Sequence, residues 1–161
     1  MRNKVMCDIL NKSNKAKARM LLETQDCHIL VTGDVGTGKT TLLECANIQD
    51  AKYFHFPELV EECLPPVAKD GKRELCEENF DDYGFLAVPE TTLILDRVCI
   101  PEDIRDSKIV HFIKTARKHG KRLVIATYPE DAREIKSLFG VVITLSLGVD
   151  REVTCDIDVS F

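Results

Sequence analysis

A glycine-rich stretch at residues 33–40 (GDVGTGKT) constrains the fold of this chain more than any other part of its sequence. It follows the apolar run 28–32 (HILVT) and leads into residues 41–46 (TLLECA), a pattern that indicates a buried strand, a tight turn and the first turns of a helix. Glycines let such a turn adopt positive φ and bring backbone N–H groups around an anion, and the positive end of the helix adds to the attraction. The order strand, G-x-x-x-x-G-K-[ST], helix therefore predicts a phosphate-binding loop, or P-loop.

We assign nucleotide binding to this loop and the residue after it: Gly33, Asp34, Val35, Gly36, Thr37, Gly38, Lys39, Thr40 and Thr41. Lys39 is expected to reach the β- and γ-phosphates, where it would take part in catalysis. The Thr40 hydroxyl is expected to occupy one position on Mg²⁺. The acidic Asp34 lies near the phosphate site, and the sequence offers no physical account of it.

Two further apolar runs end in polar residues. Residues 91–96 (TTLILD) have the pattern of a fully buried strand that ends in a carboxylate. In a chain with a P-loop, this pattern predicts that Asp96 lies beside Mg²⁺ and has a catalytic role. Residues 121–127 (KRLVIAT) end in Thr127, which is expected to lie near the γ-phosphate and to orient the attacking water. The alternative is a threonine that only ends its strand.

Strand-like and helix-like segments alternate along the chain. The expected strands are 28–33, 52–56, 91–96, 121–127 and 141–145, with a final antiparallel or edge strand at 152–159. The expected helices are 39–48, 58–65, 101–119 and 129–138, and 67–84 is expected to be a polar surface connection. This order predicts an α/β fold: a three-layer P-loop NTPase with a mainly parallel central sheet of about five strands and helices on both faces. Ligands bind such sheets at the carboxyl ends of the strands, where the loop, Asp96 and Thr127 would meet.

The N-terminal segment differs from the rest of the chain in charge. Residues 1–20 carry six Lys or Arg and one Asp, a net charge of +5, whereas the whole chain carries −5. Residues 1–25 are expected to be helical, with a break at 11–14 (NKSN). We therefore divide the chain into a basic helical arm, 1–25, and a P-loop NTPase domain, 26–161. The arm either contacts nucleic-acid phosphates or presents the solvated face of a helix.

Composition indicates a soluble intracellular protein. No apolar run approaches the roughly 20 residues of a membrane-spanning helix, and the start has no signal-peptide pattern. The seven cysteines are scattered and include no C-x-x-C pair, which is typical of reduced thiols. We expect a cytoplasmic location.

Three passages resemble the FtsK/HerA-type DNA pumps and the conjugation coupling proteins. They are residues 27–44 (CHILVTGDVGTGKTTLLE), 93–96 (LILD) and 116–131 (ARKHGKRLVIATYPED), and 141–147 (VVITLSL) lies where that family has a strand. The resemblance covers about residues 26–147. It implies the core of a P-loop ATPase that uses ATP and Mg²⁺, with a strand inserted between the P-loop strand and the strand ending in Asp96.

The chain departs from this family at two positions. The family usually has Glu after the Asp of the second strand, as the base that polarises water, and here that residue is Arg97. It also usually has Gln after the sensor threonine, and here that residue is Tyr128. Another acid such as Glu90 or Glu44 then serves as base, or hydrolysis is slow, or nucleotide binds without turnover. Arginines that stabilise transition-state charge, in trans if the protein forms a homo-oligomeric ring, are a further hypothesis; the candidates are Arg97, Arg117 and Arg122.

The sequence thus predicts an ATP-binding P-loop NTPase that hydrolyses ATP with Mg²⁺ to drive a conformational or nucleic-acid-related task. One alternative is a non-catalytic, nucleotide-dependent switch, which Arg97 favours. The other is a small nucleotide or nucleoside kinase, which would require an acceptor-binding acid and an arginine-rich lid. The region 57–90 contains acids but only one arginine, Arg73.

Overall fold

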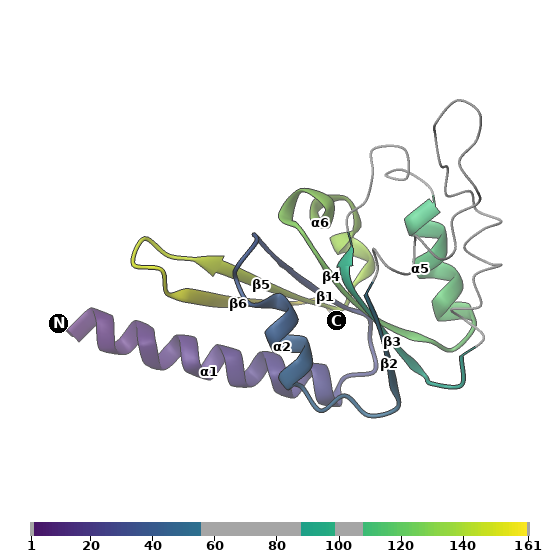
Figure 1. Ribbon diagram of the computed structural model, residues 1–161, viewed down its shortest axis with the longest axis horizontal. Helices are drawn as coiled ribbons and strands as arrows, with labels where there is room; N and C mark the ends of the chain where they lie inside the picture. Colours follow the sequence, from purple (N-terminus) through teal and green to yellow (C-terminus); the bar gives the residue numbers. More distant parts are fainter. Residues whose placement is uncertain (1, 56–87, 99–107, 161) are drawn as a thin grey trace.

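Six strands form one sheet in the computed structural model, which describes residues 2–55, 88–98 and 108–160 (Figure 1). The strands are β1 (Ile29–Gly33), β2 (Ala51–His55), β3 (Thr92–Val98), β4 (Arg122–Thr127), β5 (Val141–Leu147) and β6 (Val153–Val159). Their order across the sheet is β2-β3-β4-β1-β5-β6. Strands β1 to β5 are parallel, and β6 pairs antiparallel with β5 at one edge. The predicted mainly parallel sheet is confirmed, as is its antiparallel edge strand.

The strand order separates the P-loop strand from the strand that contains Asp96. Strand β4 pairs with β1 on one side and with β3 on the other. The inserted strand that the family resemblance implies is therefore present.

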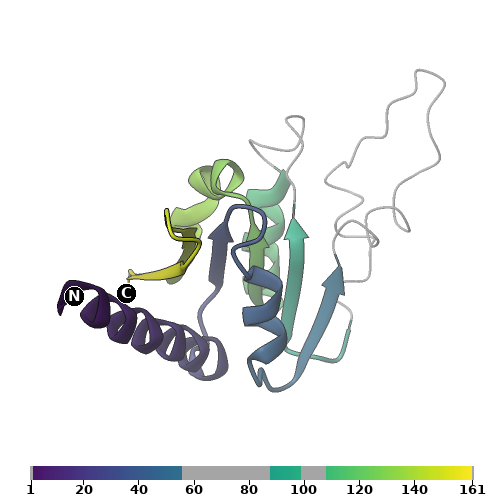
Figure 2. The same cartoon turned by 60° about the vertical axis from the view of Figure 1, so that its left-hand side comes forward.

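Helices cover both faces of this sheet (Figures 1 and 2). Helices α1 (Arg2–Thr24) and α2 (Lys39–Cys45) pack on one face, and α5 (Lys108–Lys118) and α6 (Pro129–Ile135) pack on the other. A short 3₁₀ helix, η3 (Lys136–Leu138), follows α6. The chain therefore has the three-layer α/β fold of P-loop NTPases, as predicted.

Burial on both faces explains why the central strands are apolar without interruption. Along β1, Ile29 and Val31 join the core beneath α1 and α2, whereas Leu30 joins the core beneath α5 and α6. All five residues of β1 are buried. Alternate side chains thus enter two different cores, and a polar residue on either face would be desolvated.

Helix α1 runs through residues 11–14 without the predicted break, so that prediction is wrong. Asn14 explains the continuity, because its side-chain amide donates a hydrogen bond of 2.9 Å to the Cys155 carbonyl on β6. A tertiary contact of this kind satisfies an asparagine that would otherwise compete with the helix backbone. The C-terminal half of α1 enters the core through Ala18, Leu21 and Leu22.

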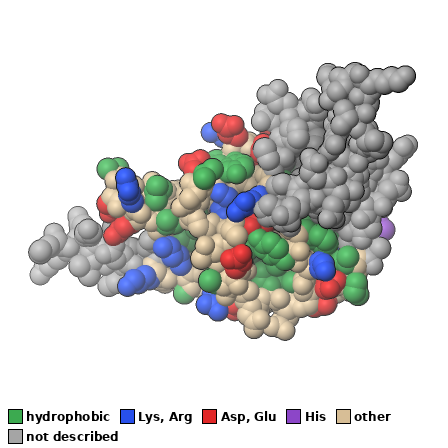
Figure 3. Space-filling view, viewed as in Figure 1, with side chains coloured by type: hydrophobic (Ala, Val, Ile, Leu, Met, Phe, Trp, Pro, Cys, Tyr) green, Lys and Arg blue, Asp and Glu red, His purple; other side chains and the backbone are tan. Residues whose placement is uncertain are grey.

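The basic side chains of α1 that the structure describes, all beyond residue 11, lie at the surface, among the Lys and Arg atoms coloured blue in Figure 3. Lys12, Lys15 and Lys17 are exposed, and Arg19 pairs with Glu23 at 3.1 Å. No described helix combines the length and hydrophobicity needed to cross a membrane. The predicted helix 58–65, the connection 67–84 and the first part of the predicted helix 101–119 lie outside the described residues.

Candidate functional site

The glycines of the P-loop meet specific steric demands. Gly36 and Gly38 have φ of 80° and 89°, a conformation that is costly for residues with a Cβ. Gly33 is required for a different reason, because a Cβ there would lie 2.5 Å from the Leu145 carbonyl oxygen of β5. The loop therefore sits directly on the β5 backbone, and α2 begins at Lys39 immediately after it.

Lys39 folds back over the loop that precedes it. Its Nζ donates hydrogen bonds to the Gly33 carbonyl at 2.5 Å and to the Asp34 carbonyl at 3.0 Å. The same Nζ lies 5.0 Å from the centroid of the Tyr128 ring, a cation–π contact. Burial lowers the pKa of Lys39, and the negative charges of Asp96 and Asp34 oppose this shift.

These contacts explain the presence of Asp34 in the loop, for which the sequence offered no physical reason. Its carbonyl accepts hydrogen bonds from the Thr37 hydroxyl at 2.8 Å and from the Thr37 backbone N–H at 3.3 Å, in addition to that of Lys39. Its carboxylate helps to keep Lys39 protonated. Asp34 therefore holds the turn and the lysine, and its own side chain is exposed to solvent.

The structure brings Thr40 and Asp96 together from separate elements. The Thr40 hydroxyl, in the first turn of α2, donates a hydrogen bond of 2.8 Å to Asp96 Oδ2 in β3. Asp96 has no exposed surface, and its Oδ1 accepts a 2.8 Å hydrogen bond from the Arg97 backbone N–H. A buried carboxylate needs such donors, because desolvation alone would disfavour its charge.

Tyr53 on β2 is a site residue that sequence analysis missed. Its hydroxyl donates a hydrogen bond to Asp96 Oδ2, the oxygen that Thr40 also contacts. Burial raises the pKa of Tyr53, and the hydrogen bond to Asp96 adds to this effect. Tyr53 pairs with Ile94, two residues before Asp96 on the same face of the sheet, so its long side chain reaches the carboxylate diagonally. The signal available in the sequence was a tyrosine within the predicted strand 52–56, because this strand could lie beside the strand that ends in Asp96.

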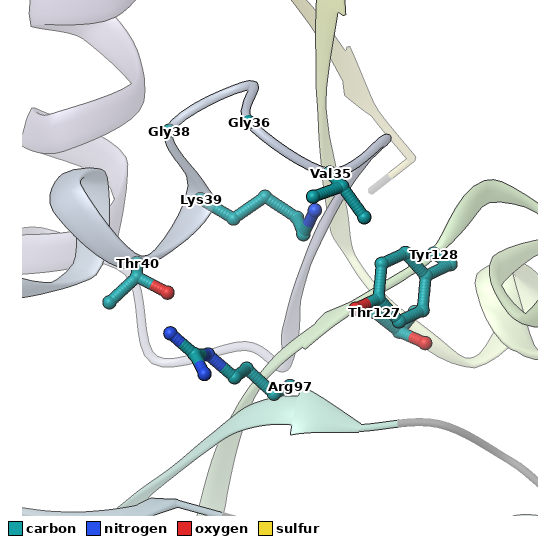
Figure 4. Close-up of a pocket in the computed structure, with 8 residues that line it drawn as sticks. All are labelled: Val35, Gly36, Gly38, Lys39, Thr40, Arg97, Thr127 and Tyr128. Atoms are coloured by element: carbon teal, nitrogen blue, oxygen red, sulfur yellow. The ribbon is translucent and has the colours of Figure 1, made fainter.

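A cavity of about 350 Å³ opens beside the P-loop at the carboxyl edge of the sheet (Figure 4). Loop and helix residues form one wall, and β3, β4 and the residue after β4 form the other. The lining residues are Val35, Gly36, Gly38, Lys39, Thr40, Arg97, Thr127 and Tyr128. Its volume falls within the roughly 300–1,000 Å³ of small-molecule sites. Two of the lining side chains, Lys39 and Arg97, are positively charged, and none of the described side chains that line the cavity carries a carboxylate.

Thr127 reaches this cavity at the end of β4 but already makes a bond inside the protein. Its side chain is fully buried, and its hydroxyl donates a 2.6 Å hydrogen bond to the Val98 carbonyl. Thr41 lines a separate apolar cavity of about 300 Å³, together with Lys15 of α1 and Val153 of β6. Thr37 also lines this second cavity, and Gly38 lines both, whereas Gly33 and Asp34 line neither.

Several other candidates lie away from the cavity. Glu90 lies two residues before the start of β3. Its carbonyl accepts a hydrogen bond from Lys121, which directly precedes β4, so Glu90 lies at the amino edge of the sheet. The hypothesis that Glu90 is the base is therefore wrong. Glu44 is exposed on α2 and is not among the cavity residues. Arg117 and Arg122 line a third cavity, at the amino edge of the sheet.

Thr40, which lines the cavity, and the buried Asp96 that it contacts suit Mg²⁺. This ion prefers oxygen ligands and is commonly held by one or two carboxylates, a hydroxyl and phosphate oxygens. Thr40 and Asp96 supply a hydroxyl and a buried carboxylate within hydrogen-bond distance of each other. The donor set therefore fits the metal predicted from the sequence.

Comparison with known proteins shows similarity only among solved structures. No protein-family model and no curated protein matches the chain. The chain is similar to AMPPCP-bound DnaA from Aquifex aeolicus, with 17% identity over 85% of this chain and 45% of that one, at a TM-score of 0.49. It is also similar to the VirB11 ATPase of the Brucella suis type IV secretion system in complex with sulphate, with 16% identity over 96% of this chain and 53% of that one, also at 0.49. The chain thus spans about half the length of each. The narrower resemblance to FtsK/HerA-type pumps stays a prediction from the sequence.

Proposed function

We propose that this chain is an ATP-binding P-loop NTPase that binds ATP as its Mg²⁺ complex and hydrolyses it. The observation that carries the proposal is the 2.8 Å hydrogen bond between Thr40, which lines the cavity beside the P-loop, and the buried Asp96. Residues 56 positions apart in sequence meet there beside the loop lysine. A glycine-rich turn with no role in binding phosphate would not require that convergence.

Each residue has a distinct role in this proposal. The loop N–H groups and the start of α2 bind phosphate oxygens. Lys39 exchanges its two loop carbonyls for phosphate oxygens and neutralises part of their charge. Thr40 and Asp96 hold Mg²⁺, which supplies charge neutralisation at the phosphates. The Thr127 hydroxyl donates a hydrogen bond to the Val98 carbonyl, and its oxygen can accept a hydrogen bond from a water at the cavity wall.

A nucleotide-dependent switch with negligible turnover is the second candidate. The observation that favours it is Arg97, a cation at the position where a base would be expected, in a cavity whose described lining contains no carboxylate. A kinase has no such support, because most of the region 57–90 that would carry its acceptor site lies outside the described residues.

Calorimetry with ATP, with and without Mg²⁺, tests binding, and phosphate release with and without DNA tests turnover. The wild type should bind MgATP, and Lys39→Ala should abolish binding or turnover. Thr40→Val should remove the Mg²⁺ dependence of binding, because it deletes a metal ligand and the partner of Asp96. Thr154→Val, which changes an exposed threonine on β6, is the matched control and should behave as wild type.

The outcomes separate the two candidates. MgATP binding with phosphate release above the Lys39→Ala background supports hydrolysis. Tight binding without phosphate release, in the presence or absence of DNA, supports the switch. No binding of ATP by the wild type would refute both.

A further inference from the structure

Strand β3 contains a bulge that places Arg97 in the phosphate cavity. Leu95 pairs with Ile125 of β4, but the next paired residue of β3 is Val98, which pairs with Thr127. Two residues of β3, Asp96 and Arg97, therefore lie opposite the single residue between Ile125 and Thr127. Such an extra residue bends the strand and redirects side chains, and bulges are frequent beside active sites.

The burial of the flanking residues shows what the bulge changes. Leu93 and Leu95 face the core beneath α5 and α6, so regular alternation would place residue 97 there as well. Val98 occupies that core instead and is fully buried. Arg97 is exposed and lines the phosphate cavity, and in Figure 4 its guanidinium extends toward Thr40. Without the extra residue, the register would bury a guanidinium in an apolar core.

Backbone strain accompanies this placement. Arg97 has φ of 56°, in the left-handed region that residues with a Cβ rarely adopt. Asp50 and Arg151, the other described non-glycine residues with positive φ, lie in turns next to strands, where such angles are common. Arg97 lies within a strand. Strain at such a position persists where the surrounding structure enforces it, and it is enriched at ligand sites.

We infer that Arg97 recognises the terminal phosphate of a nucleoside triphosphate and so makes the site selective for triphosphate over diphosphate. This inference rests on the proposed function. The loop and Lys39 lie on one wall of the cavity, whereas Arg97 enters from β3 on the opposite wall. Phosphates bound to the loop are the inner ones, and the terminal phosphate extends toward the second wall. A guanidinium there forms charge-assisted, bidentate hydrogen bonds to phosphate oxygens.

The test measures binding of a non-hydrolysable ATP analogue and of ADP, both with Mg²⁺, to the full chain. Arg97→Gln should raise the Kd of the triphosphate about tenfold or more, as expected for the loss of a charge-assisted contact, and that of ADP by less than about threefold. Arg97→Lys should fall between wild type and Arg97→Gln, because an ammonium group keeps the charge without the bidentate geometry. Arg97→Gly also removes the guanidinium and relieves the backbone strain, so it should retain the fold and lose the same selectivity.

Arg151→Gln is the matched control. Arg151 has a similar φ of 61° and is exposed in the turn before β6, outside the cavity. It should bind both nucleotides as wild type does. If Arg97→Gln and Arg97→Gly weaken both nucleotides equally, or neither, the inference is overturned while the proposed function stands. If the wild type binds neither nucleotide, the proposed function fails, and the inference fails with it.

Discussion

His28, immediately before β1, should make the stability of this protein sensitive to mild acid. Only 3% of its surface is exposed, and its Nδ1 accepts a 3.0 Å hydrogen bond from the Leu123 N–H. A proton on that nitrogen would break the bond. Burial, with the positive charges of Arg117 and, to a lesser extent, Arg122, lowers the pKa of His28 from 6.5 to about 4, against an opposing contribution from the Ile113 backbone.

The sign and size of the effect follow from these two pKa values. Between pH 6.5 and pH 4 the unfolded chain binds a proton that the folded protein does not. The contribution of His28 to stability is therefore fully present above pH 6.5, and it is lost as the pH falls toward 4. Proton linkage gives a decrease of about 2 kcal/mol in the free energy of unfolding between pH 7 and pH 5.

Urea unfolding at pH 7, 6 and 5 measures this decrease. His28→Asn cannot titrate, and its side-chain oxygen keeps an acceptor for the Leu123 N–H. Its free energy of unfolding should therefore fall by about 2 kcal/mol less than that of the wild type across this range. His119→Asn alters an exposed histidine after α5 and should follow the wild type. Identical pH dependence in wild type and His28→Asn would refute the reasoning.

Three further predictions concern the candidate site. Gly33→Ala should lower the free energy of unfolding by about 3 kcal/mol, because its Cβ would lie 2.5 Å from a backbone oxygen that cannot move away. Gly36→Ala would place its Cβ in open space, so it should lower the free energy of unfolding by only about 1 kcal/mol, the cost of its positive φ. Equal losses in urea unfolding would contradict this. Tyr53→Phe removes a donor to Asp96 and should lower the free energy of unfolding by about 1.5 kcal/mol, and an unchanged thermal unfolding curve would argue against it. Arg97→Glu should raise phosphate release at saturating MgATP about tenfold or more by supplying a base; an unchanged rate would place the base elsewhere.

Much of the fold could be predicted because it depends on local signals. Each central strand is buried on both faces, so each appears in the sequence as an apolar run. The contact between Thr40 and Asp96 followed from the rule that parallel strands end at one edge of the sheet. The same rule places Glu90, which precedes its strand in the sequence, at the opposite edge of the sheet. Applied to Glu90, the rule would have excluded this residue as a base.

The remaining features depend on contacts that no local pattern contains. The bulge at Arg97 has no glycine to mark it, and the run from Thr92 to Val98 appears continuous. The role of Tyr53 depends on the pairing of β2 with β3, which are separated by more than thirty residues. The break predicted at residues 11–14 was wrong because Asn14 bonds to a strand 141 positions later in the chain.

One row of contacts connects the phosphate loop mechanically to the N-terminal helix. Gly33 pairs with Leu145 on β5, Leu145 pairs with Cys155 on β6, and the Cys155 carbonyl binds the side chain of Asn14 in α1. Gly33 has no side chain, so the loop and β5 meet here through backbone atoms. The twelve residues of α1 before Asn14 extend over about 18 Å. By this length alone, a rotation of about 5° at Asn14 would move the start of the helix by about 1.6 Å.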